Sequence, residues 1–157
     1  KGTLHGGAPG PVLDMFDGIE KVGNADTWIA DALKRGERLM GFGHRVYRVR
    51  DPRANVLMTT VAKLKGRANR IAFAEAIEAA ALRALRDFKT ERRLDTNVEF
   101  YTALLLEALN VPREAFTPVF ALARTAGWIA HIREQEQNGR LIRPQSRYVG
   151  TSPVKAA

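Results

Sequence analysis

The sequence predicts an all-α fold, and three observations support this class. Apolar residues recur at three- and four-residue spacing along most of the chain, which is the period of an amphipathic helix. Alternating apolar and polar residues, the pattern of a half-buried strand, are almost absent. Glycine and proline stand between the periodic stretches, where helices end or begin. The chain of 157 residues is 45% apolar, enough for one globular domain with a substantial core.

The first part of the chain predicts two helices followed by a glycine-rich break. The first helix follows Pro-Gly-Pro at residues 9–11 and ends at Gly23, because proline suits a first helical turn and glycine a helix end. The second spans about residues 26–35 and stops at Gly36. Residues 39–47 hold two glycines and no helical stripe, which indicates a loop or a short extended piece.

Four more helices are predicted after this break. They span about residues 54–64, 69–88, 97–109 and 117–138. Asp-Pro-Arg at residues 51–53 indicates a turn or a helix start before the first of them. The Ala-rich second one carries the strongest helical pattern. The helix at 97–109 is expected to point Phe100, Leu104, Leu105 and Ala108 inward. Residues 89–96 indicate a polar loop, and residues 140–157 a basic tail without periodicity.

Composition excludes several classes of protein. Without cysteine, the chain has no disulfide scaffold, no thiol catalysis and no Cys-ligated metal site. No apolar run approaches the roughly 20 residues of a membrane helix, so we expect a cytoplasmic protein that does not contact membranes. The net charge of +8 suggests anionic partners, which could be nucleic acid, an acidic surface or small phosphates and carboxylates.

Two histidines lie next to glycines, where the backbone lets a ligand come close. His5 stands in Leu-His-Gly-Gly-Ala at residues 4–8, which a surface turn before a helix explains equally well. His44 follows Gly-Phe-Gly at residues 41–43, and several arginines come after it. Backbone N–H groups and guanidinium groups both suit oxyanions, so we favour a binding site here over a solvated basic loop. The lysine of a P-loop is missing.

Three further ionisable residues have a structural and a functional interpretation. Glu99 lies near a helix N-terminus, where a carboxylate usually only stabilises the helix dipole. Arg124, within a stretch of small and apolar residues, either has an anionic partner or reaches solvent. His131 is expected to pack or to face solvent, and the histidine spacing does not support zinc. Two histidines, one carboxylate and several arginines together fit enolisation next to a carbonyl, followed by carbon–carbon bond formation.

The ordered set of motifs resembles the citrate synthase family. It comprises residues 4–8, 41–47, 51–53, 97–101, 120–131 and 143–144, in the family's order and approximate spacing. Each motif alone is weak, but together they run over nearly the whole chain. The resemblance implies a multi-helical citrate synthase-like small domain, with a long C-terminal helix and an extended tail.

The resemblance also implies three catalytic residues. His5 would hydrogen-bond the thioester carbonyl of acetyl-CoA, and Glu99 would remove a methyl proton. His44 would bind the carbonyl of oxaloacetate and donate a proton as the new bond forms, and citryl-CoA would then be hydrolysed to citrate and CoA. Glu99 stands where the family usually has aspartate. It keeps the carboxylate but adds one methylene, a shift of about 1 Å or more, and we expect an active variant.

Binding residues follow from the same resemblance. Arg53 and Arg124 would hold substrate carboxylates, and Arg143 would reach into the site of the neighbouring subunit. The CoA-binding residues would be Leu4, Gly41, Phe42, Gly43, Arg45, Arg48 and Asn97. The resemblance implies no cofactor and no metal, with acetyl-CoA and oxaloacetate as substrates.

The resemblance implies a division of the chain at residue 109. Residues 1–109 resemble the family's small, CoA-binding domain, and residues 110–157 resemble the segment that returns to the large domain and the dimer interface. In the family a large helical domain precedes the point that matches Lys1. We therefore expect a C-terminal portion of a longer homodimeric protein, inactive alone.

Other functions remain open from the sequence. A related enzyme that makes 2-methylcitrate from propionyl-CoA would use the same residues, and citryl-CoA cleavage fits the same scaffold. A basic helical module that binds nucleic acid would explain the charge, but the arginines are scattered and no helix-turn-helix stands out. A helical interaction domain without chemistry leaves the two glycine-flanked histidines unexplained.

Overall fold

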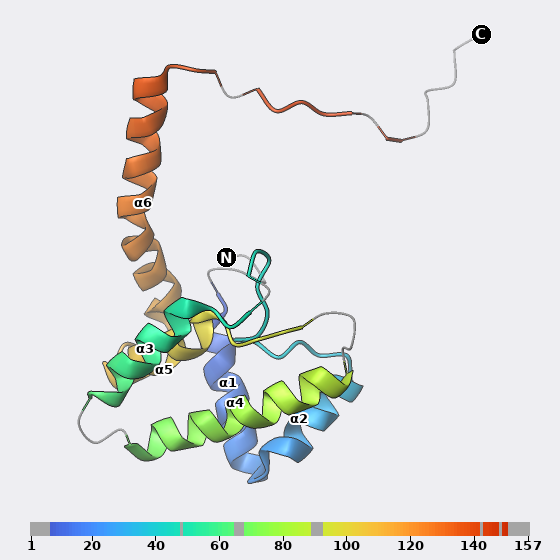
Figure 1. The fold of residues 1–157 in the computed structure, drawn as a ribbon. Coiled ribbons are helices and arrows are strands. Elements are labelled where there is room, and N and C mark those ends of the chain that lie inside the picture. Colours follow the sequence, from blue (N-terminus) through green and yellow to red (C-terminus); the bar gives the residue numbers. More distant parts are fainter. Residues whose placement is uncertain are drawn as a thin grey trace. The chain divides into compact units, whose positions relative to one another are not determined.

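The fold is helical throughout the part of the chain that the structure describes (Figure 1). The computed structural model describes residues 7–47, 49–64, 68–88, 93–141, 143–147 and 149–150. These ranges contain six α-helices, one short 3-10 helix and no strand. An isolated antiparallel bridge between Phe42 and Thr96 is the β pairing found within them. The predicted all-α class is confirmed.

All six predicted helices are present, with ends close to the expected ones. They are α1 (Pro9–Val22), α2 (Ala25–Lys34), α3 (Pro52–Ala62), α4 (Ala68–Phe88), α5 (Val98–Ala108) and α6 (Phe116–Asn138), with the 3-10 helix η1 (Arg113–Ala115) before α6. The start of α3 lies two residues before the predicted one. Asp51 caps this helix by accepting a hydrogen bond from Arg53 N, and Pro52 fits the first turn.

The chain divides into two compact units, Lys1–Ala123 and Arg124–Ala157. Helices α1 to α5 belong to the first unit, and the second begins within α6. Several large apolar side chains of that second unit are more than half exposed, among them Trp128, Ile129 and Ile132 of α6. The expected division at residue 109 concerns the domains of a longer protein and stays a prediction.

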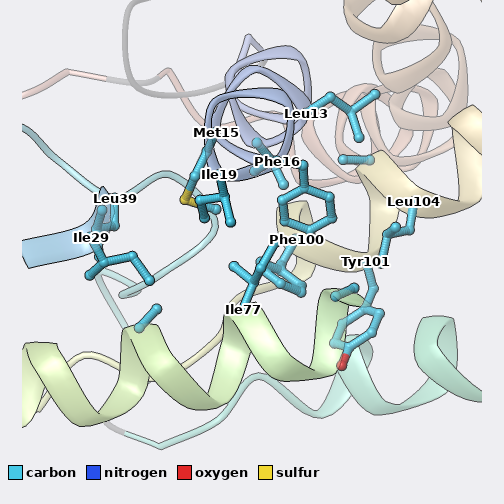
Figure 2. Close-up of a cluster of buried hydrophobic side chains, with 14 of the residues drawn as sticks. Leu13, Met15, Phe16, Ile19, Ile29, Leu39, Ile77, Phe100, Tyr101 and Leu104 are labelled. Carbon is cyan, nitrogen blue, oxygen red and sulfur yellow. The ribbon is translucent and has the colours of Figure 1, made fainter. Parts of the chain in front are cut away.

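The core of the first unit lies between α1, α4 and α5 (Figure 2). Phe16 of α1 and Phe100 of α5 are fully buried and meet edge to face, with ring centroids 5.2 Å apart. Ile77 of α4 is also fully buried, among buried alanines of the same helix. Helix α2 packs on α1 and α4, and α3 packs on α5. This packing fixes the ends of α3 and α5, where the candidate site lies.

Helix α5 buries a different face from the predicted one. Phe100 and Leu104 are buried as expected, but Leu105 and Ala108 are only half-buried. Tyr101, Ala103 and Leu106 are buried as well, although the apolar spacing did not predict this. The reason is that α5 packs against both α1 and α3, so its buried surface is wider than one stripe.

Candidate active site

The loop after α2 pairs with the segment before α5 (Figure 1). Gly43 N donates to Asp95 O at 2.7 Å, and Asn97 N donates to Gly41 O at 2.9 Å. The side chain of Asn97 donates from Nδ2 to Gly43 O at 2.9 Å, while its Oδ1 accepts from the N–H of Glu99 and caps α5. These bonds bring the predicted CoA-binding residues Gly41, Phe42, Gly43 and Asn97 together.

Glycine is required at both ends of this pairing. Gly41 and Gly43 have φ angles of +91° and +82°, a region that residues with a Cβ rarely adopt. A Cβ on Gly41 would also lie 2.9 Å from Cδ2 of the buried Phe100. The glycines therefore let the loop approach α5 closely, which explains the spacing that the sequence analysis singled out.

The ring of His44 is held by the turn that follows it. Nδ1 accepts hydrogen bonds from the backbone N–H groups of Val46 and Tyr47, each at 3.0 Å. An acceptor nitrogen carries no proton, so the neutral ring has its hydrogen on Nε2. The ring of Tyr47 stacks on His44 with centroids 4.5 Å apart. The two backbone bonds thus fix the orientation of the imidazole and leave Nε2 as its N–H donor.

Arg53 is held beside this histidine by Asp51. Its Nη2 lies 2.7 Å from Asp51 Oδ2 and its Nε lies 3.0 Å from Oδ1, while its guanidinium carbon lies 5.8 Å from the ring centroid of Tyr47. Burial alone would raise the pKa of Asp51, but hydrogen bonds and charge from Arg53 outweigh burial and lower that pKa. The same pairing raises the pKa of Arg53, so both groups are charged.

Glu99 lies on the first turn of α5 and is half-buried. The N-terminal end of α5, where it stands, is the positive end of the helix dipole. The pKa of Arg53 is raised mainly by Asp51 and to a smaller extent by the negative charge of Glu99. The Glu99 carboxylate therefore lies close enough to the guanidinium to interact with it electrostatically. An imidazole N–H, a guanidinium and a carboxylate therefore gather at the ends of α3 and α5.

Two contributions were missed by the sequence analysis. Tyr47 stacks on His44 and faces Arg53, although it was seen only as part of a motif. Glu78 of α4 is buried and accepts hydrogen bonds from Thr96 and Tyr101, although its surroundings in the sequence are those of an ordinary Ala-rich helix. No local signal marks Glu78, because its partners are distant in sequence.

The other predicted site residues are either exposed or outside the described ranges. Leu4, His5 and Arg48 lie outside the described residues. Arg45 is exposed in the loop after His44. Arg124 and Arg143 belong to the second unit, and both are exposed there. His131, expected to pack or face solvent, is exposed with Nδ1 3.2 Å from Glu134 Oε2.

Neither a metal cluster nor a membrane span is found in the described part of the chain. Its His, Asp and Glu side chains form no group of three that could hold an ion. None of its helices is long and apolar enough to cross a bilayer. The expectation that the protein uses no metal stays a prediction.

Fold and site together define a helical protein in which an imidazole, a guanidinium and a carboxylate lie near the ends of two helices. The family model described as "Citrate synthase, C-terminal domain" matches residues 1–145. This chain therefore belongs to the citrate synthase family. The family resemblance seen in the sequence is confirmed, and the nucleic-acid-binding alternative is not favoured.

Individual relatives agree with this assignment. A candidate citrate synthase 2 of Mycobacterium tuberculosis is 49% identical over 152 residues, which cover 97% of this chain and 40% of that protein. Citrate synthase 2 of Bacillus subtilis is 40% identical, covering 99% of this chain and 41% of that protein. The chain thus spans about two fifths of the length of these relatives.

A solved structure matches the fold along the whole chain. It is a ternary complex of carboxymethyl coenzyme A and oxaloacetate with citrate synthase from Thermoplasma acidophilum. It is similar to this chain with a TM-score of 0.81 and 33% identity, covering 100% of this chain and 42% of that one.

Proposed function

We propose that the complete protein to which this chain belongs condenses acetyl-CoA with oxaloacetate and hydrolyses citryl-CoA to citrate and CoA. The observation that carries the proposal is the joint placement of His44, Arg53 and Glu99. An N–H donor, a guanidinium and a carboxylate next to one another are the groups needed to bind an anionic carbonyl compound and to remove a proton.

The oxaloacetate part of the reaction falls to His44 and Arg53. Nε2 of His44 donates to the ketone oxygen, and its proton moves to that oxygen as the carbon–carbon bond forms. Because Nε and one N–H of Nη2 of Arg53 donate to Asp51, the substrate carboxylate would meet the guanidinium at Nη1 and the second N–H of Nη2. Asp51 thereby fixes the orientation of the cation before the substrate binds.

The acetyl-CoA part falls to Glu99 and to residues implied by the resemblance. Glu99 takes a proton from the methyl group, and His5 stabilises the resulting enol by a hydrogen bond to the thioester oxygen. Water then cleaves the thioester of citryl-CoA, which releases CoA. The paired loop of Gly41, Phe42, Gly43 and Asn97 would lie along CoA, with Leu4, Arg45 and Arg48. The ligands of the Thermoplasma relative support these two substrates.

The C-terminal part of the chain would connect the CoA-binding domain to the rest of a dimeric enzyme. Residues 1–109 would be the CoA-binding domain, and residues 110–157 would return to a large domain and a homodimer interface, in a cytoplasmic enzyme without cofactor. The exposed Trp128, Ile129 and Ile132 support this, because large apolar side chains close together in the sequence of one helix and exposed to solvent are typical of interaction sites. Arg124 and Arg143 would then complete carboxylate binding.

The test is an assay of released CoA thiol with the complete protein, oxaloacetate and either acetyl-CoA or propionyl-CoA. Glu99→Gln should abolish turnover while CoA binding survives, because the amide keeps the shape of the side chain but cannot accept the proton. Glu114→Gln, an exposed change in η1, is the matched control. The isolated 157 residues should form no citrate. Near-normal turnover by Glu99→Gln would refute the mechanism. A preference for propionyl-CoA would show that the protein makes 2-methylcitrate, with propionyl-CoA in place of acetyl-CoA as the acyl substrate.

A further inference from the structure

We propose that Glu78 of α4 is a positioning residue that holds together the two segments carrying the proposed catalytic groups. The inference rests on the proposed function. The two segments are residues 49–53, which include the Asp51–Arg53 pair, and residues 95–99, which include Asn97 and Glu99. Glu78 accepts a hydrogen bond from one residue of each segment, Arg50 and Thr96, and neither of these is among the residues proposed to bind substrate.

Both carboxylate oxygens of Glu78 accept hydrogen bonds from several elements. Oε1 accepts from Arg50 Nη1 and from Thr96 Oγ1, and Oε2 accepts from Tyr101 OH at 2.8 Å and from Arg50 Nη2 at 3.4 Å. Arg50 also donates from Nε to Asn55 Oδ1 of α3 at 2.6 Å. A single buried carboxylate therefore joins α4 to α5 and to both loops, and Arg50 extends the connection to α3.

The electrostatics show a carboxylate that depends on its partners. The side chain of Glu78 is only 10% exposed. Burial would lower the pKa of Arg50, but the hydrogen bond and charge of Glu78 raise it above its ordinary value. Burial raises the pKa of Tyr101, and the hydrogen bond to Glu78 raises it further, so the phenol stays protonated as a donor. Such buried pairs contribute little net stability, yet they are costly to break.

Short covalent and hydrogen-bonded links connect this network to the site. Arg50 directly precedes Asp51, whose N–H donates to Thr96 O at 3.0 Å and whose carboxylate orients Arg53. Thr96 directly precedes Asn97, which caps α5 and donates to Gly43 O. Tyr101 stands two residues after Glu99 on α5. A change at Glu78 would therefore displace Arg53 and Glu99 relative to each other.

The test compares Glu78→Gln with Glu75→Gln in the complete protein. Glu75 lies on the same helix one turn earlier, is exposed, and loses the same charge. Thermal unfolding and titration of active sites correct for the folded fraction, and kcat and KM for oxaloacetate are then measured. A lower folded fraction changes neither KM nor kcat per active site.

We expect Glu78→Gln to lower kcat per site by about 10- to 100-fold and to raise KM for oxaloacetate several-fold, because a displacement of about 1 Å has effects of this size. Glu75→Gln should match the wild type. If both variants match the wild type, the positioning role is overturned while the proposed function stands. A wild-type protein that forms no citrate overturns both.

A second variant keeps the proposal testable if Glu78→Gln does not fold. Tyr101→Phe removes one hydrogen bond to Glu78 and keeps the packed ring. It should raise KM for oxaloacetate and lower kcat per site, both by less than the first variant. In that case, wild-type kinetic constants for Tyr101→Phe overturn the positioning role.

Discussion

Replacing Gly41 by alanine tests how closely the glycine-rich loop approaches α5. Gly41 has a φ of +91°, and a Cβ there would lie 2.9 Å from Phe100 Cδ2 and 3.1 Å from Phe100 Cβ. The same Cβ would lie 3.2 Å from Cγ2 of Val12. Phe100 cannot swing aside, because its Cβ is attached to the backbone of α5 and its ring is buried against Phe16 and Phe42.

The magnitude follows from two separate costs. A residue with a Cβ at positive φ lowers the free energy of unfolding by about 1–2 kcal/mol. Alanine also lowers the entropy of the unfolded chain, which offsets about 0.4–1 kcal/mol of this loss. Forcing an extra methyl group into a packed core costs about 1–3 kcal/mol more. Gly36→Ala is the control, because Gly36 has a φ of +75° and no atom within 4 Å of the added Cβ. The backbone costs nearly cancel in the comparison, so Gly41→Ala should be the less stable variant by about 1–3 kcal/mol.

The assay is denaturant unfolding of the two variants and the wild type, in the complete protein and under identical conditions. Gly41→Ala should also weaken CoA binding, because Gly41 O accepts the hydrogen bond from Asn97 N and a shifted loop would open this pairing. Equal stability of the two variants would show that the loop lies farther from α5 than the structure places it. The steric reasoning would then be wrong.

Two further predictions concern charged pairs. The pKa of Asp51 in the folded protein lies below its ordinary value of 3.8. Its charged form therefore stabilises the fold fully at pH values above 3.8, and this stabilisation is lost as the pH falls from there through the pKa of the folded state. Asp51→Asn should therefore flatten the acid limb of the stability profile, measured by unfolding at a series of pH values, and an unchanged limb would contradict the Asp51–Arg53 pairing. Arg70→Ala should cost about 1–3 kcal/mol of unfolding free energy, because Arg70 donates twice to Glu107 at 2.9 Å and lies over two phenylalanine rings. Arg113→Ala, which breaks two more exposed pairs, should cost about 1 kcal/mol or less, and a larger loss than for Arg70→Ala would reverse this ranking.

The helices and the glycine-rich loop were predictable because their signals are local. Apolar spacing, proline at helix starts and glycine at helix ends all act within a few residues, so all six helices were found. The start of α3 was predicted two residues late, although Asp-Pro-Arg at residues 51–53 was interpreted as a turn or a helix start, and Asp51 is the cap of this helix. The inward face of α5 was partly wrong, because its burial depends on α1 and α3 together.

The polar part of the site was less predictable because its contacts are long-range. Sequence inspection treats Glu75 and Glu78 alike, as two glutamates three residues apart on one Ala-rich helix. They differ in the segments that pack against them, and the hydrogen-bond partners of Glu78 stand 18, 23 and 28 residues away in the sequence. A buried carboxylate needs hydrogen-bonding partners. Because these partners belong to other segments of the chain, their bonds to Glu78 hold those segments in place. The orientation of Arg53 and Glu99 is therefore a property of tertiary packing, and Glu75→Gln against Glu78→Gln separates that property from the helix itself.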